Sequence, residues 1–197
     1  MKEFLRKKNI IFSAKRYGID ALGAMAQGLF CSLLIGTIIN TLGSQLHIPF
    51  LSTLGEQLGI GILVTVGGYA KGATGAAMAI SIGVALQCPP LVLFSMAAVG
   101  MAANELGGAG GPLAVLVVTI FAAEFGKLVS KETKIDIIVT PFVTICVGVL
   151  LSLGCAPAIG AAASTVGTAI MWATELQPFF MGIIVSVIVG IALTLPI

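Results

Sequence analysis

Long apolar stretches separated by short polar breaks run through most of this chain. No Asp, Glu, Lys or Arg occurs in residues 21–55, 57–70, 72–104, 106–123, 137–174 and 176–197. A helix needs about 20 apolar residues to cross the hydrocarbon core of a bilayer. Several stretches suffice for one crossing, and two suffice for a crossing plus a re-entrant piece. The pattern predicts an all-α, polytopic transmembrane helix bundle with broken or re-entrant helices.

The polar breaks divide the chain into eight candidate helices. These cover residues 21–39, 51–70, 73–87, 91–103, 113–125, 137–153, 158–173 and 179–195. A continuous helix cannot run undisturbed through Pro89-Pro90, because this pair removes two backbone donors and restricts two φ angles. The glycine-rich residues 107–111 predict a second break. Gly154 to Pro157 predict a third, between the sixth and seventh candidates.

Positive charge is concentrated in two segments. Six of the ten Lys and Arg residues precede residue 17, and three more lie in residues 127–134. Because Lys and Arg accumulate in short cytoplasmic loops, we expect both segments, and therefore the N-terminus, to be cytoplasmic. Residues 40–50 contain neither and are expected outside. An odd number of crossings must separate the outer loop from the second basic loop, so the four apolar pieces between them predict three crossings and one re-entrant or interfacial piece.

The first 17 residues alternate basic and apolar side chains. This pattern predicts an interfacial basic helix over residues 1–17 on the cytoplasmic leaflet, with Lys and Arg facing anionic headgroups. Membrane lipid is therefore an expected partner. A frayed basic tail is the alternative. We expect residues 1–197 to form a single transmembrane domain.

Composition supports this assignment and excludes several functions. Hydrophobic residues make up 58% of the chain and charged residues 9%, against about 25% charged in soluble domains. Mean hydropathy is +1.12. An ordinary soluble enzyme and a nucleic-acid binder are therefore excluded. Four cysteines without a CxxC pair and a single histidine, His47, argue against a zinc site, so neither metal nor cofactor is expected. Because no phosphate-binding or catalytic motif occurs, no catalytic residue is expected.

Isolated ionisable residues are the candidates for a binding site. A charge at the bilayer centre costs about 2.5–3.5 kcal/mol on insertion scales, so such residues usually face a cavity or a partner. Glu175 lies in a polar break before Pro178, where its carboxylate can accept hydrogen bonds from substrate hydroxyls; capping of the broken helix and a plain loop position are the alternatives. Glu105 follows Asn104 at the start of the glycine-rich break. The candidate substrate-binding residues are Glu175, Glu105, Asn104 and Gln177.

Other polar residues in the apolar stretches have simpler interpretations. Gln27 is the strongly polar side chain of the first candidate helix. Lys71 is expected to extend to the inner interface. Glu124 is expected to pair with Lys127 or Lys131 at a helix end.

Three segments resemble a known family. Residues 12–22 (FSAKRYGIDAL), 123–141 (AEFGKLVSKETKIDIIVTP) and 170–179 (IMWATELQPF) are similar to the phosphotransferase-system enzyme IIC family, of the type that includes perfringolysin-regulator-like proteins. The resemblance covers nearly the whole chain but only about the N-terminal half of a typical member. The chain is therefore expected to be the N-terminal part of a longer IIC-like domain, or a half-length product that completes itself by association as a homo-oligomer.

The resemblance implies a function. Such a protein is the membrane-embedded sugar-translocating subunit of a phosphoenolpyruvate-dependent phosphotransferase system in the bacterial cytoplasmic membrane. Its partners are the sugar substrate and soluble IIA and IIB phosphocarrier proteins. In the family a Thr-Glu-Pro-like element contributes a sugar-binding Glu; Thr174-Glu175 followed by Pro178 is similar, with two residues intervening. The alternative is a membrane regulator or scaffold whose basic segments dock a soluble partner without transport.

Overall fold

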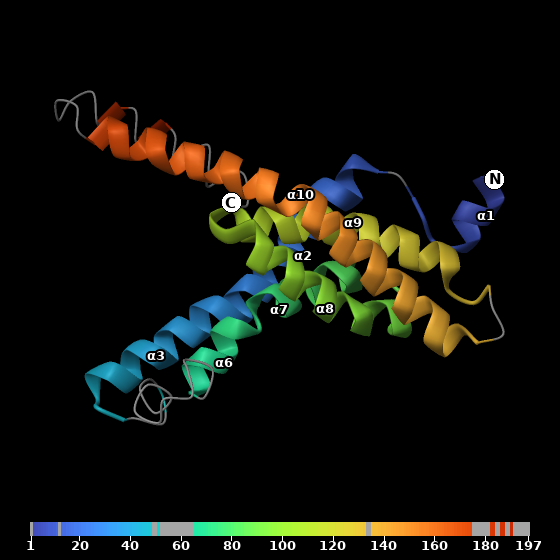
Figure 1. Ribbon diagram of the computed structural model, residues 1–197, viewed down its shortest axis with the longest axis horizontal. Coiled ribbons are helices and arrows are strands. Elements are labelled where there is room, and N and C mark those ends of the chain that lie inside the picture. The colour runs from blue at the N-terminus through green and yellow to red at the C-terminus, as the bar shows by residue number, and fades with distance from the viewer. Residues whose placement is uncertain are drawn as a thin grey trace.

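Helices make up every element in the described part of the chain, as Figure 1 shows. The computed structural model describes residues 2–11, 13–48, 51, 65–132 and 135–174, with positions 182, 183, 186, 187 and 190. The predicted all-α fold is confirmed. The elements are α1 (Lys2–Lys7), η1 (Lys15–Asp20), α2 (Ala21–Leu29), η2 (Phe30–Leu34), α3 (Ile35–Gln45), α6 (Val66–Gly72), α7 (Thr74–Ala85), α8 (Pro90–Gly107), η4 (Gly108–Gly110), α9 (Gly111–Val129) and α10 (Asp136–Thr174).

Three helical runs among the described residues are long and apolar enough to cross a membrane: Lys15–Gln45, Pro90–Val129 and Asp136–Thr168. The second run contains α8 and α9, which fold back on each other at η4 (Figure 1). Large apolar side chains lie on the outside of the runs, with Phe94 71% and Phe142 67% exposed. A water-soluble monomer rarely exposes so much apolar surface. The protein is therefore an integral membrane protein.

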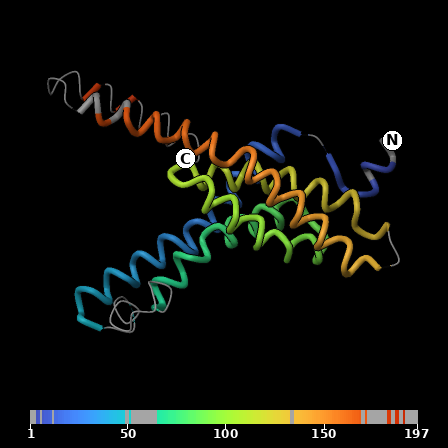
Figure 2. The backbone as a smooth tube through the Cα atoms, in the orientation of Figure 1, coloured from blue at the N-terminus to red at the C-terminus, as the bar shows by residue number. Residues whose placement is uncertain are grey.

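Four helices, α7 to α10, form the centre of the molecule (Figure 2). The α2 helix packs against α7, whereas α3 and α6 pair with each other and extend away from the centre. The C-terminal part of α10 projects past the other helices. Apolar side chains from α2, α7, α8 and α9 form the core; the largest that are almost fully buried are Met25, Met78, Ile82, Leu86, Met96, Val92, Val99, Val115 and Val118.

Glycine allows α7 and α8 to approach closely. A Cβ atom built on Gly75 would overlap the carbonyl oxygen of Gly100, and a Cβ atom on Gly100 would overlap that of Gly75. Small residues allow such backbone contact between transmembrane helices, where van der Waals packing replaces the hydrophobic driving force. The two glycines therefore set the distance between these helices.

Two of the predicted breaks are confirmed. The α7 helix ends at Ala85, and α8 begins at Pro90, where the missing proline N–H has no intrahelical partner to lose. Between them Gln87 has a φ of 54°, which turns the chain. The glycine-rich break ends α8 at Gly107, and Gly108 follows with a φ of 50°, a conformation that glycine adopts without steric cost.

The predicted break at Pro157 is wrong. The α10 helix runs for 39 residues through both Pro141 and Pro157. A proline inside a helix removes one hydrogen bond and clashes with the preceding turn, which kinks some helices and breaks others. The apolar residues on both sides of Pro157 favour continuation, since hydrocarbon offers no other partner for exposed backbone groups.

The N-terminal segment is helical over a shorter range than predicted. Helix α1 covers only Lys2–Lys7, and the chain bends at Asn9, whose φ is 56°, before the long helical run begins at Lys15. The placement of this segment on the membrane surface stays a prediction. The predicted number of crossings depends on residues 52–64, and the last candidate helix on residues 179–195; both regions lie largely outside the described residues.

Candidate functional site

The structure describes two of the four predicted substrate-binding residues, Asn104 and Glu105. Glu175 and Gln177 lie outside the described residues. Asn104 and Glu105 lie in the last turn of α8 rather than in the glycine-rich break that follows it. The half-buried side chain of Asn104 packs at the start of α9, since a Cβ atom on Gly111 would lie 2.6 Å from its Oδ1 atom. The side chain of Glu105 is exposed, so Asn104 and Glu105 do not face the same site.

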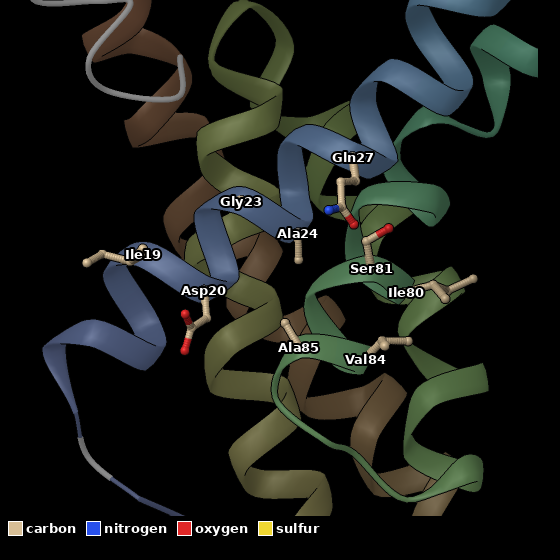
Figure 3. A pocket seen from close by; sticks show the side chains of 9 residues that line it. All are labelled: Ile19, Asp20, Gly23, Ala24, Gln27, Ile80, Ser81, Val84 and Ala85. Atoms are coloured by element: carbon tan, nitrogen blue, oxygen red, sulfur yellow. The ribbon is translucent and has the colours of Figure 1, made fainter.

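A polar groove of about 540 Å³ lies between the η1–α2 run and α7 (Figure 3). Its polar groups are the Asp20 carboxylate, the Gln27 amide and the Ser81 hydroxyl. In Figure 3 the side chains of Gln27 and Ser81 point toward each other across the groove. The full lining is Ile19, Asp20, Gly23, Ala24, Gln27, Ile80, Ser81, Val84 and Ala85.

Local sequence explains this groove. Asp20 and Gln27 are seven residues apart, close to two helical turns, so they lie on the same face. The small residues Gly23 and Ala24 between them leave open space. Ser81 donates to the carbonyl oxygen of Ala77 at 2.9 Å, which leaves its oxygen able to accept from a ligand. A carboxylate, an amide and a hydroxyl among apolar side chains are suited to a polyhydroxylated ligand.

Sequence reasoning missed this groove. Gln27 was noted only as the strongly polar side chain of an apolar helix, and its spacing from Asp20 was the signal that could have found the groove. Ser81 gave none, because a serine in a small-residue helix is usual.

A buried charge cluster lies where α9 meets the N-terminal segment. The Lys127 side chain is only 1% exposed, and its ammonium group donates to Glu124 Oε1 at 2.9 Å. It also donates to the carbonyl oxygens of Leu86, at 3.3 Å, and Asn9, at 3.4 Å. The Tyr17 hydroxyl donates to the same Glu124 oxygen at 2.9 Å. The predicted pairing of Glu124 with Lys127 is therefore confirmed.

Arg16 completes this cluster. Its guanidinium donates to the carbonyl oxygen of Leu86 at 2.5 Å and to the carbonyl oxygen of Asn9 at 3.0 Å. The Asn9 side-chain amide donates to Gln87 Oε1 at 2.7 Å. The N-terminal segment, the α7–α8 connection and α9 are thereby joined by ionic and polar contacts that span more than 100 residues of sequence. We refer to Asn9, Arg16, Leu86, Glu124 and Lys127 as the buried charge cluster.

Neither site resembles a metal centre. Within the described ranges, no group of three or more His, Cys, Asp or Glu side chains could hold a metal ion.

Comparison with known protein families identifies the family of this chain. Residues 19–197 match the model of the family described as "Phosphotransferase system, EIIC". The chain belongs to the phosphotransferase system EIIC family. This EIIC chain is therefore a membrane transport component of a phosphotransferase system. In general, members of the EIIC family work with sugar substrates and with IIA and IIB proteins. No curated protein and no solved structure matches the chain significantly.

The EIIC match covers the polar groove and part of the buried charge cluster. The polar groove lies entirely within the matched residues, and the α7–α9 part of the buried charge cluster lies there too. Residues 2–18, which include Asn9 and Arg16, precede the match.

Proposed function

We propose that this EIIC chain is the sugar-translocating subunit of a phosphoenolpyruvate-dependent phosphotransferase system in the bacterial cytoplasmic membrane. The family match over residues 19–197 carries the proposal. Soluble IIA and IIB proteins would supply the phosphate, and the EIIC chain would bind and move the sugar. The basic N-terminal segment and the α9–α10 loop would face the cytoplasm, following the distribution of Lys and Arg.

The proposed substrate contacts are Glu175, Gln177, Asn104 and Glu105. Carboxylate groups suit this role because they accept hydrogen bonds from sugar hydroxyls, and amide groups suit it because they both accept and donate them. The interhelical position of Asn104 supports a place beside a translocation path. The exposed position of Glu105 makes it the weakest of the four.

Measuring sugar uptake by variants with a substitution at Glu175 tests the proposal. Uptake of a panel of sugars would be measured in vesicles that contain the chain with phosphorylated IIA and IIB proteins. Glu175→Gln keeps the shape of the side chain and removes its charge, so uptake should fall at least tenfold. Glu132→Gln, at an exposed loop position, is the matched control and should leave uptake unchanged. Normal uptake by Glu175→Gln would remove this residue from the site.

The polar groove offers a parallel test of sugar binding. Gln27→Leu replaces the amide by an apolar group of similar size inside the groove. A loss of uptake in this variant, with normal uptake in Glu175→Gln, would place sugar binding between α2 and α7 instead.

A membrane regulator or scaffold is the second candidate function. The exposed Lys7 and Lys131 on the basic surface favour it, because they are available to a soluble partner. Retained partner binding without uptake of any sugar would support this function and exclude transport. We also propose that copies of the chain associate, which the molar mass of the detergent-purified protein would test.

A further inference from the structure

Two neighbouring cavities share the N-terminal segment and the last turns of α9. The first, which we call the basic pocket, has a volume of about 160 Å³. It is lined by Lys7, Lys8, Asn9, Gln87, Pro89, Lys127, Ser130 and Lys131. The second, which we call the apolar groove, has a volume of about 470 Å³. It is lined by Leu5, Ile10, Tyr17, Ile120, Phe121, Glu124, Phe125 and Leu128.

The basic pocket has an excess of positive charge. Of its four lysines, Lys127 pairs with Glu124, and Lys8 pairs with Glu132 at 2.5 Å and donates to the Ser130 carbonyl oxygen. Lys7 and Lys131 are exposed, and in the described part of the chain their ammonium groups form no hydrogen bond or ion pair. Asp136 accepts from the backbone N–H of Lys131 rather than from its side chain. Among the described residues no acidic side chain lines the pocket, so the vacant donors of Lys7 and Lys131 suit an anion.

Gln87 adds neutral donors to this pocket. Its side-chain oxygen accepts from the Asn9 amide at 2.7 Å, which leaves the Gln87 amide nitrogen available as a donor. Two ammonium groups and an amide form a set of donors that matches the oxygens of a phosphate group.

The apolar groove differs completely in character. Apart from Tyr17 and Glu124, its walls are aliphatic or aromatic, and Phe121 and Phe125 are 53% and 47% exposed. Glu124 Oε1 accepts from Tyr17 and Lys127, whereas Oε2 is buried without a hydrogen-bond partner. A carboxylate in this position repels an anion. An amphipathic anion would therefore direct its charge toward the lysines and its apolar part into the groove.

We propose that the basic pocket and the apolar groove together bind one anionic glycerophospholipid. The phosphate would bind Lys7, Lys131 and Gln87, and an acyl chain would lie against Phe121 and Phe125. Basic pockets at the cytoplasmic ends of transmembrane helices bind anionic headgroups through this charge complementarity. A free phosphate ion would use only the pocket and would leave the groove exposed. The inference requires the chain to lie in a membrane, and it does not depend on sugar transport.

Native mass spectrometry of the full chain in detergent tests this site. The protein would be mixed with phosphatidylglycerol or with phosphatidylcholine of the same acyl chains. We expect phosphatidylglycerol to bind about fivefold more tightly or better. The double substitution Lys7→Gln and Lys131→Gln should abolish this preference. Lys15→Gln with Lys71→Gln removes the same charge outside the pocket and should preserve it. Equal binding of both lipids, or a preference that survives the first double substitution, would contradict the proposal.

Two further measurements separate a lipid from free phosphate. Phe125→Ala should weaken phosphatidylglycerol binding several-fold, whereas Phe94→Ala, at a 71% exposed position on α8, should not. Excess inorganic phosphate should leave the lipid bound. Complete displacement by phosphate, together with no effect of Phe125→Ala, would assign the pocket to the free ion and overturn the lipid site. The elution profile in size-exclusion chromatography shows that each variant is folded.

Discussion

Lys127 donates from its ammonium group to the carbonyl oxygen of Leu86, 3.3 Å away, and so joins α9 to the C-terminal end of α7. The last carbonyl groups of a helix lack intrahelical partners, and a cation is favourable beside them. Arg16, in the N-terminal segment, donates to the same oxygen. Two cations therefore stabilise the helix end that precedes the Pro89-Pro90 break.

Removal of the buried lysine should strongly destabilise the protein. Lys127→Met leaves the mostly buried Glu124 carboxylate without its ion pair, and such a change costs about 3–5 kcal/mol. Thermal unfolding in detergent, followed by size-exclusion chromatography, would measure the effect. Lys131→Met removes an exposed charge of the same type and should change stability by less than about 0.5 kcal/mol. Adding Glu124→Gln to Lys127→Met should restore part of the loss, and an unaltered melting temperature for Lys127→Met alone would contradict the structure.

Glycine at the α7–α8 crossing should not tolerate a methyl group. Gly100→Ala places a Cβ atom against the backbone of Gly75, so the helices must separate. We expect a lower melting temperature and less folded protein in detergent. Gly154→Ala is the matched control, because nothing lies within 4 Å of its Cβ position. Alanine there should be neutral or stabilise α10 by about 0.5–1 kcal/mol, since glycine inside a helix is unfavourable. Equal melting temperatures for the two variants would show that the crossing is not tightly packed.

The thiol of Cys88 should react slowly in the folded protein. Burial raises the pKa of Cys88 from 9.0 to about 11 and outweighs the opposing effect of the Lys127 charge. Because the thiolate is the reactive form, a higher pKa leaves less of it at any pH below 9. Maleimide labelling of a variant that retains only Cys88 should therefore be about a hundredfold slower in the folded than in the denatured protein at pH 8. The rate should increase as pH rises toward 11, and a folded-state rate that levels off near pH 9 would contradict the burial of this thiol.

The proline within α10 should be dispensable for the helix. Pro157→Ala supplies the N–H that the proline lacks and removes the clash with the preceding turn, so α10 should persist with equal or higher thermal stability. Circular dichroism and melting in detergent would check this outcome. A loss of helix content would contradict this expectation and would show that Pro157 is required in α10.

Local chemistry made several features predictable. The Pro89-Pro90 pair and the glycine-rich residues 107–111 interrupt helices through their own backbone properties, and both breaks are present. The pairing of Glu124 with Lys127 follows from their spacing of three residues on one helix. Pro157 was misjudged, because whether a proline bends or ends a helix depends on the surroundings of both halves.

Sequence alone determined that this chain forms apolar helices in a membrane, because charge is so scarce and so unevenly placed along it. Where the helices meet was decided only by the tertiary structure. The groove between Gln27 and Ser81, and the convergence of Asn9, Leu86 and Lys127, join residues that are far apart in the chain. Such contacts depend on how helices pack against one another, and residue spacing within a single helix carries no record of that packing.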